Sequence, residues 1–92
     1  MIKSFKCRDT LAIFERRGSK RFTAIEQIAL RKLLQLEGAE VLEDLRIPPA
    51  NRLEKLRGNR AGEHSIRINK QWRLCFEWRD GAAWNVEIVD YH

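Results

Sequence analysis

The feature of the sequence that most constrains the fold is an alternation of large apolar and polar side chains over residues 63–88. The large apolar side chains fall on even positions: Ile66, Ile68, Trp72, Leu74, Phe76, Trp78, Trp84, Val86 and Ile88. Successive side chains of a β-strand point to opposite faces of a sheet, so this period of two predicts strands with one buried and one polar face. The simplest arrangement is a meander of three antiparallel strands, with all three tryptophans in the core.

The register of the first hairpin follows from the rule that residues directly opposite each other lie on the same face of a sheet. A three-residue loop at residues 69–71 obeys this rule, because it pairs Ile66 with Leu74 and Arg67 with Arg73. The asparagine that begins the loop tolerates the left-handed backbone conformation that such loops need. We therefore expect two arginines side by side on the polar face.

The same rule predicts a three-residue loop at residues 80–82 for the second hairpin, with Gly81 at positive φ. The expected pairs are Trp78 with Trp84, Phe76 with Val86, and Leu74 with Ile88. This register keeps every large apolar residue of the segment on one face.

Two adjacent arginines repel each other, so the predicted pair Arg67 and Arg73 needs a compensating anion. Glu77 and Glu87 lie on the same predicted face and are one candidate. A phosphate group is the other, because guanidinium groups bind phosphate through paired hydrogen bonds. The sequence leaves both alternatives open, a structural ion-pair network and a phosphate-binding surface.

The last three residues, Asp90, Tyr91 and His92, bring a carboxylate, a phenol and an imidazole together. All three groups can hold or transfer protons. If the strand continued, Tyr91 would share the arginine face, while Asp90 would point toward the buried side. Because charged groups resist burial, we expect these residues to leave the sheet at its rim. The alternative is a solvent-exposed chain end without a role.

Composition indicates the class of partner. The 92 residues predict one domain over residues 1–92, and the formal net charge is +5. A small domain this basic favours a polyanionic partner, most often nucleic acid. The two cysteines lie far apart and the two histidines form no ligand motif, so we expect no disulfide, no metal and no cofactor. No leader or bilayer-length apolar segment is evident, which predicts a soluble cytoplasmic protein without membrane contact.

The first forty residues predict a short strand at residues 1–5 and then an antiparallel pair of helices. Asp9 is expected to cap the first helix, which Gly18 ends, and a capping box at residues 23–26 is expected to open a second helix to residue 37. Apolar residues at helical spacing are expected to face the sheet: Ile25, Ile28, Ala29, Leu33 and Leu36. The opposite side, expected to face solvent or a partner, carries Gln27, Arg31, Lys32 and Gln35.

The turn between the predicted helices carries a basic cluster of Arg16, Arg17, Lys20 and Arg21. Such a cluster is either a solvated loop or a surface for phosphate contact. After the helices, two adjacent prolines at residues 48–49 forbid regular structure. Residues 51–57, which are ambiguous between strand and loop, are expected to join the meander as a further strand.

Several motifs together resemble one known family. They are the opening M-I-K-S-F, the P-P-x-N-R-L-E segment that starts at Pro48, the run from Asn51 to Trp78, and the final V-E-I-V-D-Y-H. This combination, which spans essentially the whole chain, is similar to the HigB toxins of the RelE superfamily and especially to their GraT-like branch. The resemblance implies a RelE-like α+β fold, in which a helical hairpin packs on one face of a small antiparallel sheet and the other face forms a cleft.

The resemblance also implies a function. Toxins similar to this chain bind the ribosomal A site and cut mRNA there without a metal, by attack of the substrate's own 2′-hydroxyl. A helix-turn-helix antitoxin of the HigA type silences them, and the pair reaches operator DNA only through the antitoxin. The cut needs a base, an acid and cations around a pentacoordinate phosphate.

The resemblance points to site residues position by position. Asp90, Tyr91 and His92 match the residues implicated in the cut, and Arg73 matches the family's active-site arginine. Asp90 or His92 is expected to transfer protons, with Tyr91 stacking on a base or donating to phosphate. The candidate RNA-binding residues are Arg57, Arg67, Gln71, Arg16, Arg17, Lys20 and Arg21.

Two departures from the family affect this assignment. Some HigB toxins have a histidine where this chain has Glu54, which is either a proton acceptor or a plain surface residue. Some have a lysine where it has Arg57, which keeps the charge but not the ability to release a proton. His64, at a core-side position, is expected to be a satisfied structural histidine.

Two other functions remain open from the sequence. One is a ParE-like toxin that inhibits gyrase through protein contacts, and the other is a basic RNA-binding module without catalysis. Only the nuclease function requires the residues at 90–92, so their removal distinguishes these alternatives.

Overall fold

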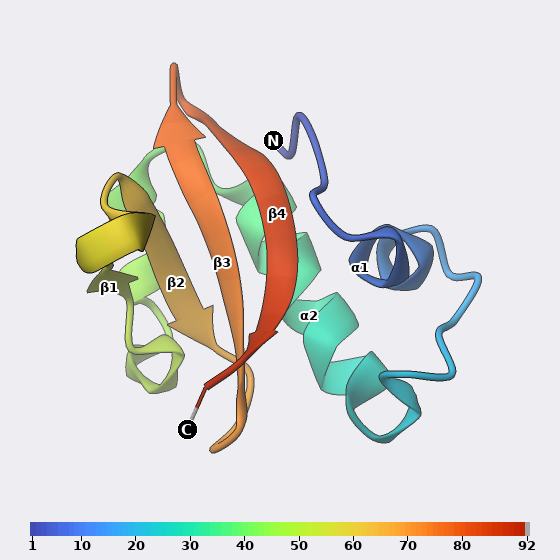
Figure 1. Ribbon diagram of the computed structural model, residues 1–92. Coiled ribbons are helices and arrows are strands. Elements are labelled where there is room, and N and C mark those ends of the chain that lie inside the picture. Colours follow the sequence, from blue (N-terminus) through green and yellow to red (C-terminus); the bar gives the residue numbers. More distant parts are fainter. Residues whose placement is uncertain (92) are drawn as a thin grey trace.

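The computed structural model describes residues 1–91, which form a four-stranded antiparallel sheet and two α-helices. The strands lie in the order β1 (Glu54–Lys55), β2 (Glu63–Arg67), β3 (Trp72–Arg79) and β4 (Ala82–Asp90). In Figure 1, α2 (Glu26–Gly38) crosses behind the sheet and α1 (Arg8–Phe14) lies beside β4, while neither covers the front face. The predicted α+β fold is confirmed. None of the helices in residues 1–91 is long and apolar enough to cross a bilayer.

The hydrophobic core lies between α2 and the even-numbered face of the sheet. Side chains of α2 that are fully buried include Ala29, Leu33 and Leu36, and they meet Leu74 and Phe76 of β3. Each large aliphatic side chain removed from water in this way stabilises the fold by about 1.5–3 kcal/mol. The predicted burial of one helix stripe against one sheet face is therefore confirmed.

The first hairpin has the predicted register. Ile66 pairs with Leu74 and Arg67 pairs with Arg73. The side chain of Asn69 closes the loop, because its Oδ1 accepts hydrogen bonds from the backbone N–H groups of Gln71 and Trp72, both at 2.8 Å. This local hydrogen bonding holds the three-residue loop in shape.

The second hairpin differs from the prediction. Its loop is the two-residue turn Asp80–Gly81, and both residues have positive φ, 52° and 71°, as a type I′ turn requires. Trp84 pairs with Glu77 rather than with Trp78, so the predicted tryptophan pair is wrong. The shorter turn shifts the register by one residue next to the loop.

A β-bulge then restores the predicted register farther along the strands. The irregularity lies between Cys75 and Glu77, where Asn85 of the opposite strand has a φ of 54°. Phe76 and Val86 therefore form no regular pair, whereas Leu74 and Ile88 pair as predicted. Trp84 consequently lies on the polar face, half-buried under the guanidinium of Arg79 at 4.6 Å, and its predicted place in the core is wrong. Of the three tryptophans, Trp72 and Trp78 do pack against the core.

The first residues run beside β4 without forming a regular strand. Two isolated parallel bridges, Ile2 with Ala83 and Phe5 with Val86, replace the predicted strand at residues 1–5. Between the two bridges, at the bulge, the backbone N–H of Asn85 donates to the side-chain hydroxyl of Ser4 at 2.8 Å. The bulge in β4 thus explains why the predicted strand is interrupted.

The helix termini are not stabilised in the predicted way. Cys7, not Asp9, is the N-cap of α1, and the Asp9 carboxylate accepts a hydrogen bond from the Ser19 hydroxyl at 3.0 Å instead. The expected capping box is wrong as well, because a short 3-10 helix, η1 (Thr23–Ile25), precedes α2. Thr23 donates back to the carbonyls of residues 19 and 20, and Glu26 accepts from the Ser19 N–H at 2.6 Å.

Lys32, which was expected to face solvent, is buried. Its ammonium donates to the side-chain oxygen of Asn51 at 2.6 Å, and the Asn51 amide donates to Gln35 and to the carbonyl of Leu45. Burial lowers the pKa of Lys32, and the neighbouring Arg31 lowers it further. The network anchors a short 3-10 helix, η3 (Pro49–Asn51), immediately before β1. The predicted strand at residues 51–57 is confirmed only over Glu54–Lys55.

Candidate active site

The polar face of the sheet places residues from β1, β2 and β3 in rows. One row runs from Glu54 through Ser65 to Cys75, and the next contains the pair Arg67 and Arg73. Ser65 and Cys75 are fully buried although no α-helix covers this face. Their short side chains form a floor on which longer side chains can lie.

Arg73 lies on this floor with a relative exposure of 7%. Its Nε donates to the Ser65 hydroxyl at 2.8 Å, and its Nη2 donates to the backbone carbonyl of Arg52 at 2.6 Å. The carboxylate of Glu54 is 3.6 Å from Nη2. Since a buried charge is costly without such partners, these contacts explain how a guanidinium is held inside a sheet surface.

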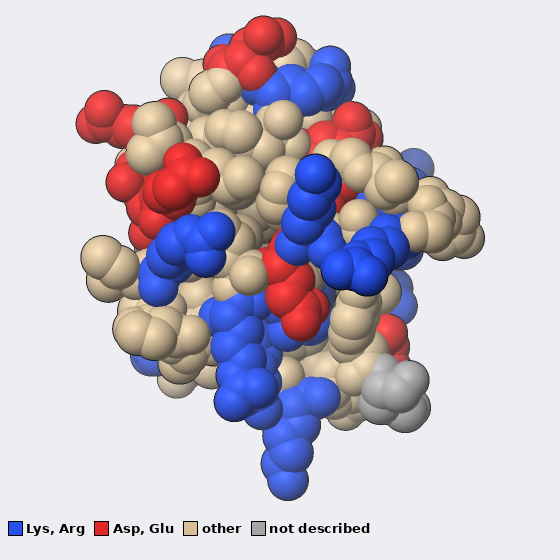
Figure 2. All heavy atoms as spheres, turned by 90° about the vertical axis from the view of Figure 1, so that its left-hand side faces the viewer, with Lys and Arg blue, Asp and Glu red and all other residues tan. Residues whose placement is uncertain are grey.

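Arg73 also borders a cavity of about 400 Å³. The cavity is lined by Arg52, Glu54, Arg67, Asn69, Lys70, Arg73 and Tyr91. The Tyr91 ring lies over the Arg73 guanidinium, 5.6 Å from it, and Arg67 donates from Nε to the carbonyl of Asn69 at 3.1 Å. Four cationic side chains thus surround one carboxylate. In Figure 2, Lys and Arg side chains likewise enclose a small acidic patch on the face that carries the β1 edge.

Four residues predicted from the sequence therefore meet in this cavity: Glu54, Arg67, Arg73 and Tyr91. Of the two alternatives left open by the sequence, compensation of the arginine pair by Glu77 and Glu87 is contradicted. Glu87 binds Arg60 at 3.0 Å and Glu77 binds Arg79 at 3.4 Å. Within residues 1–91, Arg67 forms no ion pair with a carboxylate. An anion bound in the cavity would balance the positive charge of Arg67.

Tyr91, the last described residue, lines the cavity, and Asp90 precedes it at the end of β4. β4 continues to Asp90, which pairs with Trp72, so the expectation that Asp90 leaves the sheet is wrong, whereas Tyr91 lies beyond the end of the strand. Asp90 is exposed and does not line the cavity; its Oδ2 accepts a hydrogen bond from the Gln71 amide at 3.2 Å. His92, the third of the predicted residues, lies outside the described residues.

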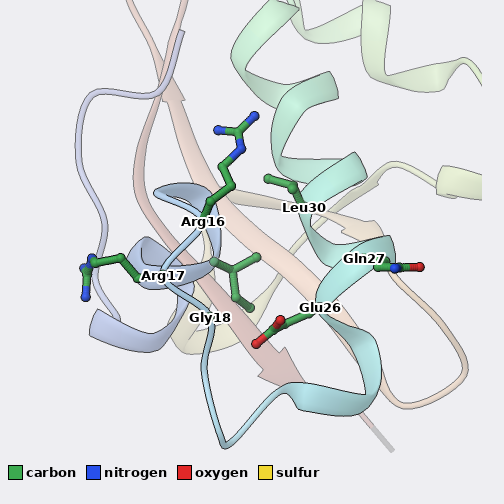
Figure 3. Close-up of a pocket in the computed structure, with 7 residues that line it drawn as sticks. Arg16, Arg17, Gly18, Glu26, Gln27 and Leu30 are labelled. Carbon is green, nitrogen blue, oxygen red and sulfur yellow. The ribbon is translucent and has the colours of Figure 1, made fainter.

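The basic cluster between the helices lies apart from the cavity. Figure 3 shows a separate pocket, of about 330 Å³, with Arg16 and Arg17 on the α1 side and Glu26 on α2. Arg17 pairs with Glu15 at 2.7 Å, and Arg21 approaches the Asp9 carboxylate at 4.0 Å. The structure does not bring the side chains of residues 16, 17, 20 and 21 to Arg73. Arg57, which follows β1, is exposed and does not line the cavity either.

Four residues of the site were missed by the sequence analysis: Arg52, Ser65, Asn69 and Lys70. Arg52 adopts a left-handed conformation with a φ of 46°, which an arginine seldom does, and this turns its carbonyl to Arg73. No sequence pattern predicts a left-handed conformation at residue 52. The predicted loop at residues 69–71, by contrast, would have placed Asn69 and Lys70 beside the arginine pair.

Two other titratable side chains lie in or near the sheet without joining the cavity. His64 stacks on Phe76 with ring centroids 6.2 Å apart, and burial lowers its pKa. Its Nδ1 has no hydrogen-bond partner among residues 1–91, so the expected satisfied histidine is wrong. Burial raises the pKa of the Cys75 thiol to about 11. No group of three or more His, Cys, Asp or Glu side chains in residues 1–91 is arranged to hold a metal ion.

Comparison with known proteins gives consistent matches in sequence. A family model described as the RelE-like toxin of the type II toxin-antitoxin system HigB matches residues 4–92. Toxin HigB-1 of Vibrio cholerae is 54% identical over 66 residues, which are 72% of this chain and 70% of that protein. Endoribonuclease HigB of Proteus vulgaris is 30% identical over 93 residues, which cover 100% of both.

Solved structures match in fold. YafQ from Escherichia coli superposes with a TM-score of 0.59 over 98% of this chain and 93% of its own, at 12% identity. The toxin-antitoxin complex YoeB-YefM from Staphylococcus aureus gives a chain with a TM-score of 0.58, at 20% identity, over 100% of this chain and 98% of that one. At these identities the likeness concerns the fold alone, and it confirms the predicted RelE-like arrangement of helices and sheet.

Proposed function

The chain belongs to the HigB-like family of RelE-like toxins from type II toxin-antitoxin systems, and from this premise we propose that it is an endoribonuclease that cuts mRNA on the ribosome. The relative from Proteus vulgaris is named an endoribonuclease. The observation that best supports the proposal is the immobilised guanidinium of Arg73, which borders a cationic cavity together with a carboxylate and a phenol.

The proposed reaction uses the substrate's own nucleophile. A carboxylate takes the proton of the ribose 2′-hydroxyl, the 2′-oxygen attacks the adjacent phosphorus, and the bond to the 5′-oxygen breaks as that oxygen receives a proton. The products are a 2′,3′-cyclic phosphate and a 5′-hydroxyl. This route draws its acid and base from the protein, and we propose that it needs no metal or other cofactor.

Arg73 would stabilise the additional negative charge of the pentacoordinate phosphate. A donor that is already held in place does not have to reorganise during the reaction, and removal of one such donor typically costs about 10²–10³ in rate. Arg67 has no carboxylate partner within residues 1–91, so it can meet the same phosphate or the next one. Arg52 and Lys70, at the edge of the cavity, suit flanking phosphates.

Two carboxylates can act as the base in this proposal. Glu54 lies in the cavity, 3.6 Å from Arg73, which argues for Glu54 on geometry. Asp90 stands at the rim beside Tyr91 and is the second candidate. The acid would be Tyr91, whose ring lies over Arg73, or His92.

The remaining candidate RNA-binding residues, all basic except Gln71, would serve binding to ribosomal RNA rather than the cut. The net charge of +5 favours a polyanionic surface, and we assign Arg57, Gln71 and the cluster at Arg16, Arg17, Lys20 and Arg21 to such contacts. We further propose a cytoplasmic toxin that a HigA-like helix-turn-helix antitoxin inhibits, with operator DNA contacted through that antitoxin. The pairing of YoeB with YefM, whose toxin chain has this fold, supports an antitoxin partner.

The test is to incubate the purified protein with mRNA alone and with the same mRNA on programmed ribosomes, followed by mapping of the cut ends. We expect cuts on ribosomes and none, or far fewer, on free mRNA. Growth inhibition without any cut, together with inhibition of gyrase, would contradict the proposal and favour the ParE-like alternative. Binding to RNA without growth inhibition would favour a non-catalytic module.

A further inference from the structure

We propose that Ser65 is a positioning residue, whose buried hydroxyl fixes the plane of the Arg73 guanidinium for transition-state binding. The proposal rests on the proposed function, because it concerns the same cavity. Ser65 belongs to β2, is fully buried and faces the polar side of the sheet between Glu54 and Cys75. It does not line the cavity itself, so it acts only through Arg73.

The hydrogen bonds to Arg73 explain why orientation, and not charge, is what Ser65 controls. The guanidinium is a rigid plane, so two acceptors at different nitrogens determine where its remaining N–H groups point. Ser65 Oγ accepts from Nε at 2.8 Å, and the carbonyl of Arg52 accepts from Nη2 at 2.6 Å. Nη2 also donates to the backbone carbonyl of Ser65, but at 3.5 Å this contact is much longer than the other two. Within residues 1–91, Nη1 has no hydrogen bond, so its two donors remain for a ligand.

The ion pair with Glu54 cannot replace this orientation. Its nitrogen and oxygen are 3.6 Å apart, and the Glu54 side chain is 52% exposed, whereas Arg73 is buried. A half-exposed carboxylate at this distance is screened by water and restricts the guanidinium weakly. The two neutral acceptors, which lie in the rigid sheet and in the turn before β1, therefore hold the plane.

The length of the Ser65 side chain matters as well as its hydroxyl. Arg73 is on β3, opposite Arg67, and it reaches diagonally across the sheet to residue 65 on β2. A longer side chain at position 65 would occupy the space in which the guanidinium lies. A smaller one without oxygen would leave Nε buried without an acceptor, which favours rotation of the group toward water.

The variants for the test are Ser65→Ala, which removes the acceptor, and Ser65→Thr, which retains it on a strand-compatible residue. Ser19→Ala is the matched control, since it removes the hydroxyl of another buried serine, which donates to Asp9 and does not line the cavity. Two readouts are needed: the single-turnover rate and half-saturation concentration for mRNA on programmed ribosomes, and the exchange of the Arg73 Nε–H with solvent by NMR. Melting curves accompany every variant.

We expect Ser65→Ala to lower the cleavage rate about 10- to 100-fold with little change in the half-saturation concentration, because a misplaced group about 1 Å away costs on that order. Ser65→Thr should recover most of the rate, and Ser19→Ala should remain near wild type. In an Arg73→Ala background, Ser65→Ala should cause no further loss. The Arg73 Nε–H signal should exchange slowly in the wild type and rapidly in Ser65→Ala.

Several results would overturn the assignment. If Ser65→Ala cleaves like the wild type, or loses further activity in the Arg73→Ala background, Ser65 does not act through Arg73. If the wild type does not cleave at all, the proposed function fails, but the NMR readout still decides whether Ser65 holds the guanidinium. Should Ser65→Ala fail to fold, unprotected Nε–H exchange in the wild type would by itself reject the role, and protected exchange that persists in Ser65→Thr would support it.

Discussion

The protein carries two groups of arginines that look equally basic in sequence but differ in how they are held. In the helix-connecting loop, Arg17 and Arg21 are exposed and face nearby carboxylates, those of Glu15 and Asp9. In the sheet, Arg73 is buried and its short hydrogen bonds go to neutral oxygens. The Glu54 carboxylate also lies 3.6 Å from Arg73, but neutral groups fix the guanidinium in place, which supports the proposal that the sheet group is the reactive one.

Among the substitutions, replacement of Arg73 should lower the cleavage rate most. A small effect would contradict the distinction between the sheet arginines and the loop arginines. We expect Arg73→Ala to lower the cleavage rate on programmed ribosomes about 10²–10³-fold, because it removes a preorganised donor to the transition state. Arg73→Lys should recover little, since an ammonium cannot bind Ser65 and the Arg52 carbonyl in the same plane. Arg79→Ala is the matched control, because Arg79 ends the same strand, is exposed and lies outside the cavity.

The effect of Glu54→Gln should come next in size. This variant tests the role of Glu54, the one carboxylate that lines the cavity among residues 1–91. If Glu54 is the base, the loss of its charge should lower the rate about 10²-fold, within the range usual for a general base. Asp90→Asn is the parallel variant at the rim. A larger loss of cleavage rate in Asp90→Asn than in Glu54→Gln, measured at several pH values, would indicate that Asp90 and not Glu54 is the base.

These two predictions show how far the sequence determines the site. The alternation of residues 63–76 and the rule for opposite residues were enough to place Arg67 beside Arg73, because both depend on local periodicity. The hydrogen bond from Arg73 to the Arg52 carbonyl depends on a left-handed arginine, and no pattern in the sequence requires one. The place of Asp90, in the strand but outside the cavity, depends in the same way on tertiary packing.

The fold was predictable to a similar extent. The stripe on α2 and the first hairpin were correct, but the burial of Lys32 was not, because its partner Asn51 is 19 residues away. In the second hairpin an Asp-Gly pair is the strongest short signal for a two-residue turn, and the longer loop was chosen because it kept Trp84 in the core. The bulge at Asn85 reconciles the two-residue turn with the predicted register farther along the strands, at the cost of placing Trp84 on the polar face.

A second buried cation, Lys32, extends the comparison to stability. Like Arg73 it is held by a neutral oxygen, so Asn51→Ala should destabilise the fold by about 1–3 kcal/mol as the ammonium loses its acceptor. Urea unfolding measures this change. Gln35→Ala is the control, since it removes a partner of Asn51 and leaves the Lys32 contact in place. Equal effects from both variants would contradict a special role for the buried ammonium.

The pH dependence of that stability has a defined sign. Burial lowers the pKa of Lys32 in the folded state below the unfolded value of 10.5, so the unfolded chain binds more protons between the two values. Stability should therefore rise with pH in that interval through this group. Lys32→Met should remove the rise, which unfolding curves recorded from pH 8 to pH 11 would reveal; an unchanged slope would contradict the assignment.

The smallest effect is expected in the loop. Replacing Arg16, Arg17, Lys20 and Arg21 together by alanine should leave the maximal rate within about threefold, since exposed ion pairs contribute little and none of these side chains reaches Arg73. Their proposed contact with ribosomal RNA predicts weaker binding and a shallower dependence on salt. A salt titration of ribosome binding measures both quantities.

The most direct test of the central claim compares the wild type, Arg73→Ala and the fourfold loop variant on the same programmed ribosomes, with chemical analysis of the new RNA ends. We predict 2′,3′-cyclic phosphate ends for the wild type and for the loop variant, and their formation about 10²–10³-fold more slowly in Arg73→Ala at an unchanged melting temperature. Loss of the cut in the loop variant while Arg73→Ala retains it would contradict the assignment of the active site to the sheet.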